Sequence, residues 1–277
     1  MNTRHRRKFL PILLLALLAI TGPPLLGQEQ KTSSAAVPEK SKFHLFLLAG
    51  QSNMAGRGKV TEADRKPIKR VFMLDKEGQW RPAVDPMHFD KPAAGVGIGR
   101  TFAAEMLKDL PPDVSIGLIP AAAGGSAIDS WTPGGYHAQT KSNPWDDAVR
   151  RTKIAMQSGS LKGILWHQGE SDSNDRLSST YEAKLHDLIK RFRDKFQSPG
   201  VPFVAGQLGQ FPEKPADENR QRVMSIIRTL PDKVPFTAFA DSVGLGHNGD
   251  QVHFNADAYR EFGKRYADAL KKMSAAK

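Results

Sequence analysis

The sequence of 277 residues contains no cysteine. This absence excludes disulfide bonds, thiolate nucleophiles, cysteine-based zinc sites, iron–sulfur clusters and the lipid-modified cysteine that anchors a bacterial lipoprotein. A chain of this length can bury enough core to fold without disulfides. The motif H-E-x-x-H is also absent, and no carboxylates show metal-ligand spacing. The sequence therefore predicts no metal and no organic cofactor.

Long apolar runs are scarce as well. The most apolar segment, residues 9–20, is only about a dozen residues long, whereas a membrane-spanning helix needs ~20. It follows a basic segment at residues 4–8, and this order is typical of a secretory signal peptide. We interpret residues 1–27 as a signal peptide and expect a secreted or periplasmic protein without stable membrane insertion. A retained membrane anchor is the alternative.

Charge of one sign is in excess but is not concentrated in one place. Lys and Arg total 40 against 29 Asp and Glu, which gives a formal net charge of +11. Acidic residues interrupt the basic ones, as in residues 184–195, and this mixture is typical of a solvated helix face. Because no motif combines basic and aromatic residues, we expect no nucleic-acid partner. The sequence leaves the oligomeric state open.

The remaining chain divides into a linker and one domain. Residues 28–41 are polar with Ser and Pro, which indicates a flexible linker, and residues 42–277 form the domain. Strands are expected at 43–49, 114–120, 163–167, 202–208 and 234–240, with a small hairpin at 70–81 and helices at 100–110, 144–157, 180–196, 217–230 and 256–273. This alternation predicts a parallel sheet with helices on both faces. Functional residues are then expected at the carboxyl ends of the strands.

Four polar clusters stand at such positions. Ser52, in the run Gly50–Met54, follows a buried strand at a tight turn and is a candidate nucleophile. The paired glycines before Ser126 could expose backbone N–H groups to developing negative charge. Capping by the serine and packing of a small-residue loop are the alternative explanations.

The other two clusters supply a base and an acid. In the segment 166–172, the Gln168 amide could donate to an oxyanion and Glu170 could orient a histidine. In the run Asp250–His253, the D-x-x-H spacing brings a carboxylate close to an imidazole, which then accepts a proton from serine. His247 is a competing base. A polar loop and a capping aspartate are the alternative explanations here.

Together these four clusters resemble the blocks of the SGNH/GDSL hydrolase superfamily, over residues 42–272. The combination of G-Q-S-N-M with W-H-Q-G-E is most similar to the sialate O-acetylesterase and acetyl xylan esterase (carbohydrate esterase family six) branch. The resemblance implies a flavodoxin-like three-layer α/β/α sandwich with a central parallel sheet. It also implies that O-acetyl groups are removed from a glycan through an acetyl-serine.

The resemblance also assigns roles to residues. Ser52 matches the nucleophile and His253 the base, while Asp250 and Glu170 are two candidates for the acid that orients the base. The backbone of Ser52 and Gly125 and the amide of Gln168 match the oxyanion donors. An esterase for non-carbohydrate short-chain esters and a catalytically silent glycan-binding module remain the alternatives. Three aromatic residues are candidates for stacking on sugars, with packing in the core as the alternative: Trp131, Trp145 and Tyr136.

Overall fold

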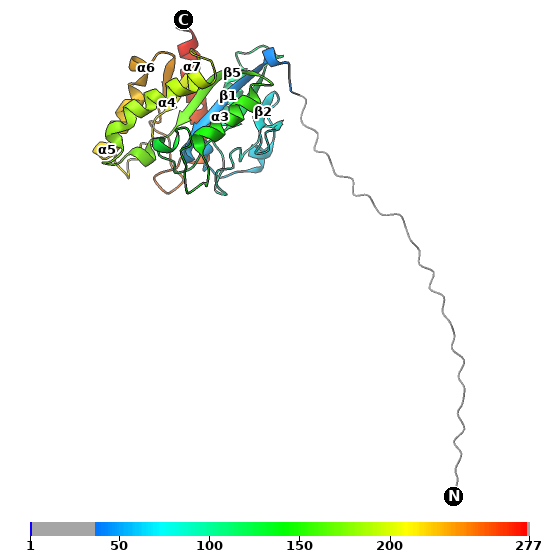
Figure 1. Ribbon diagram of the computed structural model, residues 1–277, viewed down its shortest axis with the longest axis horizontal. Coiled ribbons are helices and arrows are strands. Elements are labelled where there is room, and N and C mark those ends of the chain that lie inside the picture. The colour runs from blue at the N-terminus through cyan, green and yellow to red at the C-terminus, as the bar shows by residue number, and fades with distance from the viewer. Residues whose placement is uncertain (2–36, 276–277) are drawn as a thin grey trace. The chain divides into compact units, whose positions relative to one another are not determined.

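The computed structural model describes Met1 and residues 37–275 (Figure 1). Apart from Met1, the predicted signal peptide at 1–27 lies outside the described residues. The predicted linker at 28–41 overlaps them only at its end, where the 3-10 turn η1 (Lys40–Lys42) begins. No helix in the described part of the chain is both long enough and apolar enough to cross a membrane.

A seven-stranded sheet forms the centre of the domain, in the order β3-β2-β4-β1-β5-β6-β7. The strands are β1 (Phe43–Gly50), β2 (Val71–Leu74), β3 (Trp80–Pro82), β4 (Ser115–Pro120), β5 (Ser160–His167), β6 (Phe203–Gly206) and β7 (Thr237–Ala240). Neighbouring strands are parallel except for β2 and β3, which form the predicted hairpin. The chain forms β2, β3 and β4 on one side of β1 first, and β5, β6 and β7 on the other side afterwards. The carboxyl end of β1 is therefore a topological switch point, where ligand sites of such sheets form.

Helices cover both faces of this sheet, so the predicted three-layer α/β/α architecture is confirmed. The helices are α1 (Ser52–Ala55), α2 (Gly99–Leu107), α3 (Pro144–Ala155), α4 (Tyr181–Lys195), α5 (Glu218–Arg228), α6 (Leu230–Lys233) and α7 (Ala256–Ala275). Short 3-10 turns are η2 (Glu62–Arg65), η3 (Ile128–Ser130), η4 (Glu170–Asp172) and η5 (Ser178–Thr180). Helices α3, α4 and α5 pack on one face, and α2 and α7 on the other. Figure 1 shows α3 and α4 in front of β1 and β5.

Strand β1 is buried on both sides because its apolar run faces two separate cores. Phe43, Leu45 and Leu47 belong to the core under α3 and α4, whereas Phe46 and Leu48 belong to the core under α2 and α7. Side chains alternate across a strand with a period of two, so one uninterrupted apolar run supplies both cores. This packing fixes the carboxyl end of β1, where the site begins.

Candidate active site

The turn after β1 places Ser52 at the edge of the sheet. Gly50 makes this turn with a φ of +136°, and a Cβ at this position would lie 2.0 Å from the carbonyl oxygen of His167. Only glycine adopts such a backbone conformation without cost and allows so close an approach. Ser52 then begins the short helix α1 and is 7% exposed.

A histidine and an aspartate from the other end of the chain complete a hydrogen-bonded series with Ser52. His253 Nε2 lies 2.9 Å from Ser52 Oγ, and His253 Nδ1 lies 2.5 Å from Asp250 Oδ2. Asp250 Oδ1 also accepts hydrogen bonds from the N–H groups of Val252 and His253, at 2.9 and 2.8 Å. Partial burial opposes ionisation, but these donors outweigh it and hold the pKa of Asp250 below its usual value. An ionised Asp250 favours the Nδ1–H tautomer, which leaves Nε2 free to accept the Ser52 proton.

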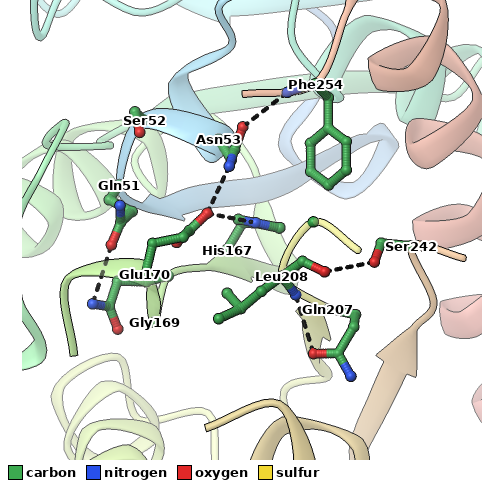
Figure 2. Close-up of polar contacts among 12 residues, drawn as sticks. Gln51, Ser52, Asn53, His167, Gly169, Glu170, Gln207, Leu208, Ser242 and Phe254 are labelled. Atoms are coloured by element: carbon green, nitrogen blue, oxygen red, sulfur yellow. Dashed lines mark hydrogen bonds and ion pairs between the residues drawn. The ribbon is translucent and has the colours of Figure 1, made fainter. Parts of the chain in front are cut away.

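Asn53 connects the turn that carries Ser52 to the loop that carries His253. Its Nδ2 donates to the Val252 carbonyl at 3.0 Å and to Glu170 Oε1 at 2.6 Å. Its Oδ1 accepts from the Phe254 N–H at 3.4 Å, as Figure 2 shows, and from the Tyr259 hydroxyl at 2.6 Å. Asn53 was not predicted from the sequence to have a role at the site. Its position beside the candidate nucleophile was a signal, but its partners lie far away in the sequence.

Two backbone N–H groups are free to bind an oxyanion. Among the described residues, none accepts a hydrogen bond from the N–H of Ser52 or of Gly125. Gly125 has a φ of +88°, a backbone conformation that strongly favours glycine. Ser171 Oγ donates to the Gly125 carbonyl at 2.9 Å and holds the loop. Unpaired donors of this kind are what an oxyanion hole needs.

The structure does not support the predicted oxyanion role of Gln168. Its Nε2 faces the Ser126 carbonyl at 3.1 Å, Gln51 Oε1 at 3.4 Å and, most closely, the Asp172 carboxylate. Gln168 is fully buried, and an amide has only two hydrogens to donate, so internal acceptors use both. Gln168 instead helps Asp172 to hold the N–H of Ile128, at 3.0 Å from Asp172 Oδ2. Burial raises the pKa of Asp172 to about 6, although the bonds from Gln168 and Ile128 act in the opposite direction.

Glu170 does not take the place of the acid beside His253. Its Oε1 accepts from Asn53 and lies 3.3 Å from His167 Nε2, and Figure 2 shows it pointing toward these two residues. Burial opposes ionisation of this carboxyl, but His167 and Asn53 outweigh it and hold its pKa at about 2. Of the two candidate acids, the structure therefore brings Asp250 to His253 and places Glu170 on Asn53.

Other candidates from the sequence lie elsewhere. The His247 ring contacts Phe211 and lies 3.6 Å from Glu213, whereas His253 is the histidine at Ser52. Trp131 and Trp145 are 0% and 4% exposed and pack in the core, so the packing alternative holds for both and neither stacks on a sugar. Tyr136 is 60% exposed and is therefore the remaining candidate for stacking on a sugar. Within the described ranges, no three His, Asp or Glu side chains form a group that could hold a metal ion.

Residues 42–272 match the family described as "Carbohydrate esterase, sialic acid-specific acetylesterase". The chain belongs to this family. It is therefore a carboxylic ester hydrolase of the carbohydrate acetylesterase type, and the resemblance seen in the sequence is confirmed.

Known proteins similar to this esterase agree with the assignment. A probable carbohydrate esterase of Arabidopsis thaliana is 28% identical over 263 residues, which cover 88% of this chain and 95% of that protein. The crystal structure of the Arabidopsis protein matches with a TM-score of 0.74, covering 85% of this chain and 99% of the other. A probable 9-O-acetyl-N-acetylneuraminic acid deacetylase of Escherichia coli K12 is 21% identical over 202 residues, 57% of this chain and 62% of that protein. The structure of NanS, at 16% identity, shares the fold with a TM-score of 0.69 and coverage of 87% and 100%.

A buried ion pair supports the glycine loop of this esterase. Arg57 Nη2 lies 2.7 Å from Asp90 Oδ2, and both side chains are almost fully buried. The same carboxylate oxygen accepts the N–H of Gly124 at 2.9 Å. Neither residue was singled out from the sequence, because nothing local marks Asp90 as the partner of a loop more than thirty residues further along.

Proposed function

We propose that this esterase removes O-acetyl groups from glycans through an acetyl-Ser52 intermediate. The observation that carries the proposal is the series Asp250–His253–Ser52, with contacts of 2.5 and 2.9 Å. Family membership limits the chemistry to ester hydrolysis, and this series contains a nucleophile, a base and an acid in the order that such hydrolysis needs.

In the proposed reaction, Ser52 Oγ attacks the acetyl carbonyl while its proton passes to His253 Nε2. A tetrahedral intermediate forms, and its oxyanion accepts hydrogen bonds from the N–H groups of Ser52 and Gly125. Losing one such donor typically costs ~3–4 kcal/mol of transition-state stabilisation. The bond from the acyl carbon to the sugar oxygen then breaks, and His253 gives its proton to that oxygen. The sugar leaves with a free hydroxyl.

Water completes the proposed cycle. His253 takes a proton from a water molecule, whose oxygen attacks the acetyl carbon of acetyl-Ser52. The bond to Ser52 Oγ breaks, His253 returns the proton to this oxygen, and acetate leaves. Asp250 stays ionised throughout and stabilises the imidazolium in both halves of the reaction.

Acetylated xylan and O-acetylated sialic acid are the proposed substrate types. The name of one relative, a probable 9-O-acetyl-N-acetylneuraminic acid deacetylase, supports the sialic acid. Acetylated xylan rests on the resemblance of the sequence motifs to the acetyl xylan esterase branch, and the other relative is named only a probable carbohydrate esterase. A short-chain ester without a sugar is the alternative substrate.

We further propose that residues 1–27 direct export, that residues 28–41 are a linker and that residues 42–277 act as the esterase in a secreted or periplasmic location. Support comes from the order of the basic and apolar segments in the leader. N-terminal sequencing of the protein recovered outside the cytoplasm tests this part. A mature chain starting near Gln28 is expected, and an intact leader in the membrane fraction would contradict it.

The test of activity compares wild type with Ser52→Ala on p-nitrophenyl acetate and p-nitrophenyl octanoate. We expect acetate turnover that Ser52→Ala abolishes and little turnover of octanoate. Acetylated xylo-oligosaccharides and 9-O-acetyl-N-acetylneuraminic acid then identify the sugar. Activity that survives Ser52→Ala would reject the nucleophile. A folded protein that hydrolyses none of these esters would favour a silent binding module.

A further inference from the structure

A cavity of about 360 Å³ opens beside the glycine loop of the active site. Its wall includes Ala121–Ala123, the segment between β4 and Gly125, and also Asp90. Ala123 N donates to the Gly50 carbonyl at 2.9 Å, next to the turn that carries Ser52. One wall of the cavity is therefore hydrogen-bonded to the turn that carries Ser52, and a pocket of this size can hold a sugar residue.

A buried cation without a carboxylate partner lines this cavity. Arg151 is 2% exposed, and its Nε and Nη2 donate to the carbonyls of Pro120 and Leu74 at 2.7 and 2.6 Å. Its Nη1 has no hydrogen-bond partner, and no ion pair joins it to a carboxylate among the described side chains. Because burial removes water from the guanidinium, its charge is screened less than that of a surface residue.

The charges around Arg151 leave the cavity positive. Its two acidic wall residues are already paired, Asp90 with Arg57 at 2.7 Å and Asp147 with Arg150 at 3.0 Å. Two further wall residues, Lys76 and Lys141, are exposed and form no ion pair within the described part of the chain.

Two more carboxylates lie near Arg151 without lining the cavity. Asp75 is bonded to Arg81 at 3.0 Å, and Glu77 is exposed. Because the acids on the wall are paired and these two lie outside it, the unpaired cations make the electrostatic potential inside the cavity positive. A bound anion is therefore stabilised there.

An aromatic ring gives the cavity a surface for a sugar ring. Phe89 is 42% exposed, and the Arg151 guanidinium carbon lies 4.5 Å from its ring centroid. The flat face of a pyranose packs on such rings, while its carboxylate requires a positive environment.

We propose that this cavity binds the carboxylate-bearing unit of an acidic glycan, so that the acetyl group of the same or the adjacent unit reaches Ser52. The proposal rests on the proposed function and deepens it, because it makes the preferred substrate an acidic O-acetylated glycan. Uronates and sialic acids share the required chemistry. Their difference in size and in the position of the acetyl group distinguishes them in the test.

The experiment uses the exposed lysines, because replacement of the buried Arg151 would disturb the two carbonyls that it holds. Lys76→Glu/Lys141→Glu reverses two charges at the cavity. Lys153→Glu is the matched control, since Lys153 is also exposed and lies on the same helix α3 as Arg151, but it does not line this cavity. The substrates are an acetylated xylo-oligosaccharide with glucuronate, the same oligosaccharide without glucuronate, 9-O-acetyl-N-acetylneuraminic acid and p-nitrophenyl acetate.

We expect the double variant to raise KM for an acidic substrate about tenfold or more, with the neutral substrates within about twofold of wild type. The acidic substrate that responds identifies the source of the carboxylate. Equal changes for acidic and neutral substrates, an equal change in Lys153→Glu, or no preference of wild type for acid would overturn the proposal.

A binding measurement separates this proposal from the proposed function. Ser52→Ala protein is titrated with the glucuronate-bearing oligosaccharide lacking acetyl groups, and with its neutral counterpart, by calorimetry. Preferential binding of the acidic sugar that Lys76→Glu/Lys141→Glu removes would support the cavity even if no acetyl ester were hydrolysed. Equal binding of both sugars would reject it even if the esterase were active.

Discussion

The domain contains two histidine–carboxylate pairs with the same spacing of three residues, His167 with Glu170 and Asp250 with His253. The first pair is buried, with side chains 0% and 7% exposed, and the second lies at the surface, with Asp250 42% exposed. Only His253 contacts Ser52. A buried pair can orient a framework, but a base that must exchange protons with substrate and water has to be accessible. The spacing in the sequence is the same in the two pairs. Which histidine reaches Ser52 is decided by the direction in which its loop faces.

The largest effect is expected from Ser52 and His253 themselves. Ser52→Ala or His253→Ala should lower kcat for p-nitrophenyl acetate on the order of 10⁵-fold, because the two groups act as one unit. For the same reason, the double variant should be no worse than either single one. Steady-state kinetics of the three proteins measure this, and additive losses would mean that the two residues do not act together.

The two candidate acids, Asp250 and Glu170, should differ strongly in their effect on the rate. Asp250→Asn should lower kcat about 10³- to 10⁴-fold, since the tautomer of His253 is then no longer fixed. Glu170→Gln should keep far more activity, because Gln can still accept the hydrogen bond from Asn53. Kinetics of both variants beside wild type decide the matter, and a larger loss for Glu170→Gln would make Glu170 the acid of the reaction.

Asn53 should show an intermediate effect, as the link between the two regions. Asn53→Ala removes its bonds to Val252 and Glu170 and loosens the His253 loop, so kcat should fall about 10- to 100-fold with little change in KM.

The matched control is Asn143→Ala, since Asn143 also donates to loop carbonyls, those of Gly134 and Gly135, at 3.3 and 3.1 Å. It should lower Tm without lowering kcat. If both variants changed Tm and kcat alike, Asn53 would only support the fold.

The last prediction concerns stability in acid and not the rate of the reaction. The pKa of Glu170 is lowered from 4.5 to about 2 in the folded chain. Its contribution to stability is therefore fully present above about pH 4.5 and is lost as pH falls toward 2, on the order of 3 kcal/mol in total. Wild type should lose Tm more steeply than Glu170→Gln between pH 5 and 2.5. Thermal unfolding followed by circular dichroism measures both curves, and parallel curves would contradict the pKa.

Local patterns in the sequence were enough to predict most elements of the fold. The apolar run of β1 and the periodicity of α4 predicted both elements to within a residue or two, since each buries a continuous face. The tight helix α1 was missed because four residues give no periodicity. In the site, too, local contacts were predictable and distant ones were not. Asp250 and His253 are neighbours in the sequence, so their contact was predictable, whereas the partners of Gln168 and Glu170 come from other loops. Whether these two side chains face the reaction centre or buried groups of the domain depends on how the loops fold together.

Ser52 and His253 are separated by 201 positions in the chain, and the loop that carries His253 leads directly into the last helix, α7. During synthesis at ~5–20 residues per second, the proposed nucleophile is made roughly 10–40 s before its proposed base. Until the loop that carries His253 has been made and has folded onto the domain, Ser52 has no His253 beside it. We therefore expect a chain truncated before His253 to lack esterase activity, even though its Ser52 is intact.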